Sequence, residues 1–192
     1  NDLDTPQMVR LERTVNRSNV VTAAVASALP KFRELFPDQV FRRDIPVVTQ
    51  DLTFLAVRIV CVEKIYAHFT EADAYLLIQK TLQSIENCVI AHSGAVIKSV
   101  DENVLATFHG CTQGVQAAFD VLSRIRELPE LEGIEVNCAV HRGSTLVTTQ
   151  NGRLDYFGTT ARTVESIVSK THSSVILTDS VFVDPDADYW IE

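Results

Sequence analysis

Hydrophobic positions from residue 52 onward alternate between two patterns, one typical of buried strands and one typical of amphipathic helices. Branched and aromatic residues fill 52–62 (LTFLAVRIVCV), which predicts a buried strand. Apolar residues spaced three and four apart over 71–92 predict a helix with one buried face. Thr70 stands where an N-cap is expected, and Ser93-Gly94 is a typical C-terminal signal.

The same alternation continues to residue 178. The predicted elements are strands over 95–100 and 104–108, a helix over 112–128, strands over 134–140 and 145–149, a turn at Asn151-Gly152, an extended piece over 154–157, a helix over 159–170, and a strand over 175–178. An irregular acidic tail is expected after them. This order predicts an α/β (α+β) fold with a ferredoxin-like βαββαβ core and an added helix–strand. The sheet would be mostly antiparallel, with helices on one face and either the late helix or a partner on the other.

The first fifty residues have a different character. Residues 1–36 predict a helical segment, and three prolines then mark 37–50 as a linker to a domain over 51–192. The helical segment fits either an arm packed on the domain or a coiled-coil signalling helix. Pro37 and Pro46 lie in the linker, and Pro30 lies near the end of the helical segment before it.

Charge and hydropathy exclude several classes of protein. The 192 residues include 17 Lys and Arg against 25 Asp and Glu, a formal net charge of −8, which disfavours binding to nucleic acid. No run reaches about 18 apolar residues, so we expect no membrane contact by this segment. The chain starts at Asn1 without a leader pattern. We therefore expect a cytoplasmic piece of a larger multidomain signalling protein.

Cysteine and histidine spacing gives no metal-binding motif. The four cysteines form no CxxC pair, so we expect no structural metal and interpret them as small buried hydrophobic residues in a reducing compartment. His109 and His141 have no carboxylate cluster around them in sequence, and we expect them to be surface or internally bonded side chains. The cysteines are Cys61, Cys88, Cys111 and Cys138.

Several segments carry a family resemblance. The pieces 95–100 (AVIKSV) and 104–108 (VLATF) resemble a strand–turn–strand that reads VVKTIGDGVLAVF. The piece 140–147 (VHRGSTLV) resembles IHTGEVVVG, and 155–160 (DYFGTT) resembles the entry to a helix that carries VNLAARL. In this order, over about 52 to 183, the chain resembles the class III adenylate/guanylate cyclase catalytic domain.

The resemblance implies that the catalytic positions are altered. These cyclases hold two metal ions on two aspartates, and here Arg58 and Glu102 stand at those positions. A guanidinium offers no lone pair to a cation, so no metal and no cofactor are expected. The Asn and Arg of the family are matched by Arg162 and Ser166, so no catalytic residue is expected. We expect Arg58 to be paired with Glu102, because an unpaired buried charge is costly.

Three residues keep a possible role in binding nucleotide. Lys98 and Asp155 match the lysine and the acidic residue that contact the purine in adenylate-type members, and Arg162 could meet a phosphate. The same residues also fit an exposed charge on a strand and a helix cap.

We therefore predict a degenerate cyclase homology domain, a pseudo-cyclase that dimerises with itself or with another cyclase-like domain as a regulatory and interaction module in signal transduction. One alternative is an active or residual adenylate/guanylate cyclase, making a cyclic nucleotide from ATP or GTP. It would need Mg²⁺ or Mn²⁺ on Glu102 with Asp101 or Glu63. The other alternative is a sensor that binds a purine nucleotide without turnover.

Overall fold

The computed structural model describes residues 26, 29–35, 47–131, 133–150, 153–170 and 174–183. Within the predicted N-terminal helical segment it shows helix α2 (Pro30–Leu35), in which Pro30 is the first residue. This is a position that proline tolerates, because the first helical N–H has no partner to lose. Apart from residues 26 and 29, the remainder of that segment lies outside the described residues, as do the turn at Asn151-Gly152 and the tail beyond 183.

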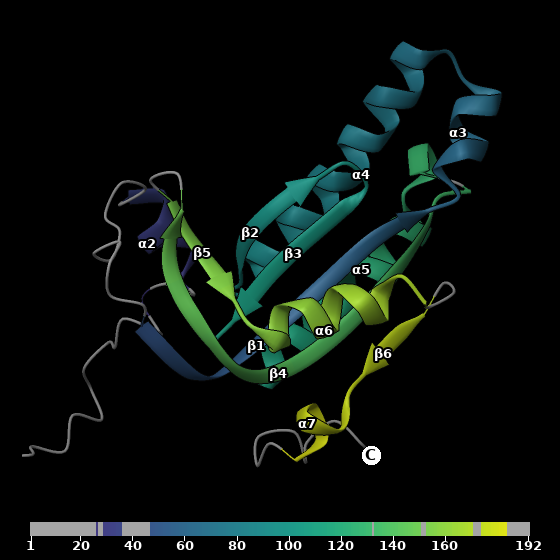
Figure 1. Cartoon of the computed structure of the whole chain (residues 1–192). Helices are drawn as coiled ribbons and strands as arrows, with labels where there is room; N and C mark the ends of the chain where they lie inside the picture. The colour runs from purple at the N-terminus through teal and green to yellow at the C-terminus, as the bar shows by residue number, and fades with distance from the viewer. Residues whose placement is uncertain are drawn as a thin grey trace, which may run out of the picture.

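In the described part of the chain, six strands form one sheet (Figure 1). The hydrogen-bonded order is β2–β3–β1–β4–β5, and β6 pairs with β4. Among the strand pairs of the described residues, β4–β6 alone is parallel, so the mostly antiparallel sheet of the sequence prediction is confirmed. The strands are β1 (Val47–Val60), β2 (Ala95–Val100), β3 (Asn103–Phe108), β4 (Glu135–Gln150), β5 (Arg153–Phe157) and β6 (Val175–Leu177).

Helices cover both faces of the sheet (Figure 1). Helices α4 (Glu71–Ala91) and α5 (Cys111–Glu127) pack on one face, and α6 (Thr159–Val168) packs on the other. Helix α6 therefore covers the second face of the sheet, for which the sequence allowed either the late helix or a partner. The short elements are α3 (Val62–His68), η1 (Pro129–Leu131) and α7 (Asp179–Phe182).

Strand β1 shows why the sheet needs both covers. Leu55 and Val57 belong to the core beneath α4 and α5, whereas Phe54 and Ala56 belong to the core beneath α6. Successive residues of a strand point to opposite faces, so an unbroken apolar run buries both. The fold is the expected α+β arrangement with an added helix and strand.

The cap at the start of α4 is also confirmed. The Thr70 hydroxyl oxygen accepts the Asp73 backbone N–H at 3.2 Å, and the Thr70 hydroxyl donates to the Asp73 carboxylate at 2.7 Å. The first of these bonds satisfies one of the free N–H groups at the helix start.

Some boundaries differ from the prediction. The ranges 134–140 and 145–149 belong to one strand, β4, because β1 runs beside it and pairs Leu52 with Gly143 in the part expected to be irregular. Strand β1 starts at Val47, inside the predicted linker. It ends at Val60, because Cys61 adopts a left-handed conformation (φ 59°) and α3 follows. The predicted irregular tail begins with a helical turn, α7.

Candidate functional site

An ion pair joins the end of β1 to the turn between β2 and β3. Arg58 lies opposite Asn103 in the register of β1 and β3, and Glu102 lies in the turn just before it. The Ile59 N–H donates to the Glu102 carbonyl at 2.9 Å, which fixes the turn against the strand. The Arg58 Nη2 atom donates to Glu102 Oε1 at 3.1 Å. The expected pairing of these two residues is confirmed.

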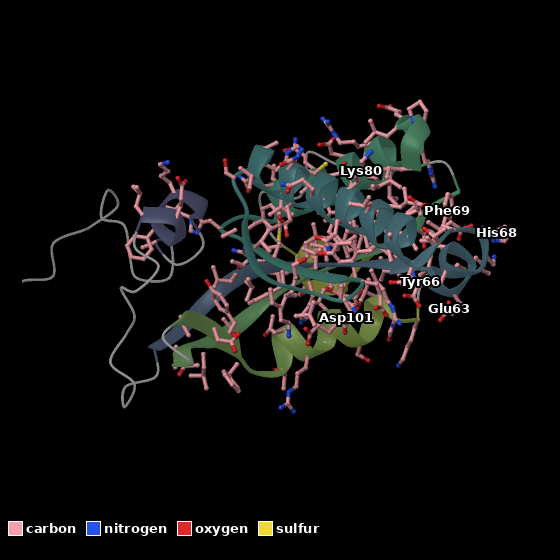
Figure 2. All side chains as sticks on the ribbon, turned by 90° about the horizontal axis from the view of Figure 1, so that it is seen from above. Glu63, Tyr66, His68, Phe69, Lys80 and Asp101 are labelled. Atoms are coloured by element: carbon pink, nitrogen blue, oxygen red, sulfur yellow. The ribbon has the colours of Figure 1, made fainter. Side chains whose placement is uncertain are left out.

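This arrangement does not fit a two-metal site. The Glu102 carboxylate already accepts from a guanidinium, and that guanidinium has no lone pair for a cation. Within the described ranges, no three His, Cys, Asp or Glu side chains form a group that could hold a metal ion. The two further carboxylates named from sequence, Glu63 on α3 and Asp101 in the turn, are exposed (Figure 2). They do not complete a ligand set with Glu102.

A cavity of about 370 Å³ lies between the sheet and α6 and contains Lys98. Its walls are largely apolar, and include Ala56, Leu105 and Val168. Lys98 Nζ meets Glu165 Oε1 of α6 at 2.5 Å, with both side chains about half exposed. Sequence reasoning missed Glu165. The sequence contained one indication that Glu165 could reach the sheet: it lies one helical turn after Ala161, whose side chain faces the sheet.

The other residues proposed to bind nucleotide lie elsewhere. Asp155 is on β5, at the opposite end of the strand order from β2, and its carboxylate accepts the Tyr156 N–H at 2.8 Å. Arg162 and Ser166 are exposed on α6, one turn apart. Lys98 lines the cavity beside α6, whereas Asp155, Arg162 and Ser166 do not. The structure therefore brings Lys98 together with Glu165 rather than with Asp155.

The histidines are placed as expected. His109 is exposed, and His141 is half-buried, with Nδ1 at 2.8 Å from the Thr178 hydroxyl and 3.1 Å from the Ser180 hydroxyl. Burial lowers the pKa of His141, because a charged imidazole loses hydration there.

Three cysteines are buried, as the sequence predicted, and one is not. Burial raises the pKa of the Cys138 thiol to about 12 and that of Cys88 to about 11, with Asp120 adding to the shift at Cys88. These thiols are therefore neutral at physiological pH. Cys111 is also buried, but Cys61 is exposed at the start of α3, so its interpretation as a buried residue is wrong. The Cys61 side chain lies outside the core because the chain turns at this residue, between β1 and α3.

No family model and no curated protein matches this sequence. Solved structures do match the fold. Adenylate cyclases from Trypanosoma brucei in their monomeric state align with a TM-score of 0.67 and 13% identity, over 75% of this chain and 80% of theirs. The monomeric guanylyl cyclase domain of the RhoGC fusion protein from Blastocladiella emersonii gives 0.65 and 12%, over 71% and 85%. The adenylyl cyclase CyaB from P. aeruginosa gives 0.61 and 12%, over 72% and 81%.

The chain has the fold of a nucleotidyl cyclase catalytic domain. At this level of identity the match establishes the fold alone. The chemistry of this cyclase-fold domain has to be inferred from its own side chains. In the part of the chain that the structure describes, no helix is long and apolar enough to span a membrane.

Proposed function

We propose that this cyclase-fold domain is catalytically inactive and acts as a self-associating regulatory module in signal transduction. The observation that carries the proposal is the 3.1 Å contact between Arg58 and Glu102. It stands at the two positions where the family resemblance implies metal-binding aspartates. One carboxylate engaged by a cation is a poor site for the two metal ions that such chemistry requires.

The direct test is a turnover assay on the purified domain. ATP and GTP are supplied separately with Mg²⁺ and with Mn²⁺, and cyclic AMP and cyclic GMP are measured by chromatography. We expect no product above that of a heat-denatured sample. Cyclic nucleotide formation that Glu102→Ala abolishes would overturn the proposal, because it would assign Glu102 a catalytic role.

Self-association is supported by an exposed apolar row across three strands. Val48, Leu146 and Phe157 are neighbours in the strand register, and their exposed fractions are 65%, 38% and 42%. Adjacent side chains at cross-strand positions form a continuous patch. Such a patch favours contact with a second copy of the domain or with another cyclase-like domain.

A second candidate function is purine-nucleotide binding without turnover. The cavity of about 370 Å³ beside Lys98 supports it, since small-molecule pockets combine mostly apolar walls with a few polar groups. To contact the ligand, the Lys98 ammonium would have to give up its ion pair with Glu165. A rise in melting temperature with ATP or GTP, lost in Lys98→Met, would support this function.

A further inference from the structure

A second and larger cavity lies on the other side of the β2–β3 turn. It has a volume of about 530 Å³, is open to solvent on one side, and is lined by residues of α3, α4, the end of β2 and the turn. This volume lies within the range of small-molecule sites. Its apolar part comprises Val62 with Ile78 and Leu82, and the last two are almost fully buried. A ligand with an aliphatic chain would therefore find a matching wall.

The charged groups that line this cavity are all acidic. Glu86 of α4 and Asp101 and Glu102 of the turn contribute carboxylates, and none of the described lining residues is Lys or Arg. Glu102 has its partner in Arg58. Within the described ranges, Glu86 and Asp101 make no ion pair, so their charge is left for a ligand.

The basic residues of the two helices point elsewhere. Lys80, the basic residue of α4, lies on the opposite side of that helix from Tyr66 and Asp101 (Figure 2). Lys64 of α3 lines a different hollow, together with Cys61. The cavity therefore has a negative potential that its own helices do not cancel.

Two phenol rings complete the lining. Tyr66 of α3 and Tyr75 of α4 are 49% and 57% exposed and both line the cavity. The face of an aromatic ring attracts an organic cation, and the attraction strengthens as the cation loses water. An anion would be repelled here. An inorganic divalent ion would find no group of three or more suitable ligands among the described residues.

We propose that this cavity binds a small aliphatic ammonium compound, of the diamine or polyamine class. The ammonium groups contact the Glu86 and Asp101 carboxylates and the two tyrosine rings. The methylene chain packs on Val62, Ile78 and Leu82. This cavity shares Asp101 with the Lys98 cavity and is otherwise lined by different residues. The proposal does not depend on whether the domain binds or turns over nucleotide.

The test is titration of the full chain with spermidine and putrescine by isothermal calorimetry at physiological salt. The neutral analogue 1,4-butanediol and Mg²⁺ are titrated in parallel. We expect saturable binding of the amines, weaker by roughly two- to five-fold in Tyr75→Leu, the size of one exposed cation–π contact. Glu86→Gln should weaken it at least as much, and added salt should weaken it further.

Two matched controls separate a site from general attraction to an acidic surface. Glu127→Gln removes one exposed carboxylate from α5, and Phe69→Leu removes one exposed ring from the end of α3; neither residue lines the cavity. Both controls should bind spermidine as the parent does. Melting curves confirm that all four variants are folded.

Three results would overturn the proposal. The first is the absence of saturable amine binding. The second is equal weakening by Glu127→Gln and Glu86→Gln, which would show diffuse electrostatic attraction. The third is binding of Mg²⁺ or butanediol as tight as that of spermidine, which would show that an ammonium on an aliphatic chain is not what the cavity selects.

Discussion

Arg58 and Glu102 are 44 positions apart in the chain, and their side chains meet at 3.1 Å at the end of β1. The two side chains are 38% and 29% exposed, so water weakens the attraction and the pair contributes no more than about 1 kcal/mol to stability. Its importance is chemical. The Arg58 guanidinium lies beside the Glu102 carboxylate, at the place where a metal ion would need a second oxygen ligand.

Replacing Arg58 by Asp should place two carboxylates side by side. Arg58→Asp loses the ion pair and adds like-charge repulsion, so we expect the free energy of unfolding in urea at neutral pH to fall by about 1–2 kcal/mol. Millimolar Mg²⁺ or Mn²⁺ should recover part of this loss, because a cation relieves the repulsion.

The control for that variant is Arg58→Met, which removes the pair without adding a carboxylate. It should lose up to about 1 kcal/mol and show no response to metal. An Arg58→Asp variant as stable as the parent, and indifferent to Mg²⁺ and Mn²⁺, would show that the two side chains do not share a site.

Removing the charge of Glu165 should free Lys98. The pair is about half exposed, so Glu165→Gln should cost less than about 1 kcal/mol of stability. If the cavity binds purine nucleotides, ATP should raise the melting temperature of Glu165→Gln more than that of the parent, because Lys98 no longer has a competing partner. The double variant with Lys98→Met should lose that response. An equal response in the parent and Glu165→Gln would contradict the competition.

The core leaves no room for a methyl group at Gly94. A Cβ atom built there would lie 2.2 Å from Cε1 of Phe108, a fully buried ring. Gly94→Ala should therefore lower the free energy of unfolding by about 2–3 kcal/mol. The control is Gly110→Ala, where the nearest atom is the end of the flexible Gln113 side chain, with an expected loss of no more than about 1 kcal/mol. Equal losses in a denaturant titration would show that the ring can move aside.

The environment of His141 predicts a pH dependence of stability. Burial lowers its folded-state pKa below the unfolded value of about 6.5, so the unfolded chain binds more protons between the two values. Stability from this residue is complete above about pH 6.5 and is lost as the pH falls toward the folded pKa. In His141→Gln this part of the pH profile should disappear, whereas the exposed control His68→Gln should retain it. Parallel profiles for the parent and His141→Gln would refute the assignment.

Self-association should depend on the apolar row of β1, β4 and β5. Leu146→Glu places a charge in the middle of that row, so it should shift the domain toward monomer in sedimentation velocity at tens of micromolar. Phe119→Glu on α5 changes another exposed apolar side chain, which lies outside the row, and should leave the distribution unchanged. A monomeric parent, or a dimer that Leu146→Glu leaves intact, would rule out this surface.

The sequence determined the elements of the fold and much of their arrangement. The unbroken apolar run of β1, the spacing in α4 and the Thr70 cap are local signals, and the structure has each of them. The argument against a metal site at Arg58 combined two things: the family resemblance, which places this residue at a metal-binding position, and the chemistry of a guanidinium, which has no lone pair for a cation. Its pairing with Glu102 was predictable through the family resemblance, since that resemblance places the two positions together.

Only the tertiary structure decided which side chains meet across elements. Lys98 pairs with Glu165 because α6 packs on the sheet face beneath it, and no local pattern states that pairing. The continuity of β4 depends on β1, which supplies hydrogen-bond partners where the sequence alone favours a break. Likewise, the acidic cavity between α3, α4 and the β2–β3 turn draws its lining from segments far apart in the chain. Periodicity reports which face of an element is buried, whereas the partner across that face depends on packing geometry.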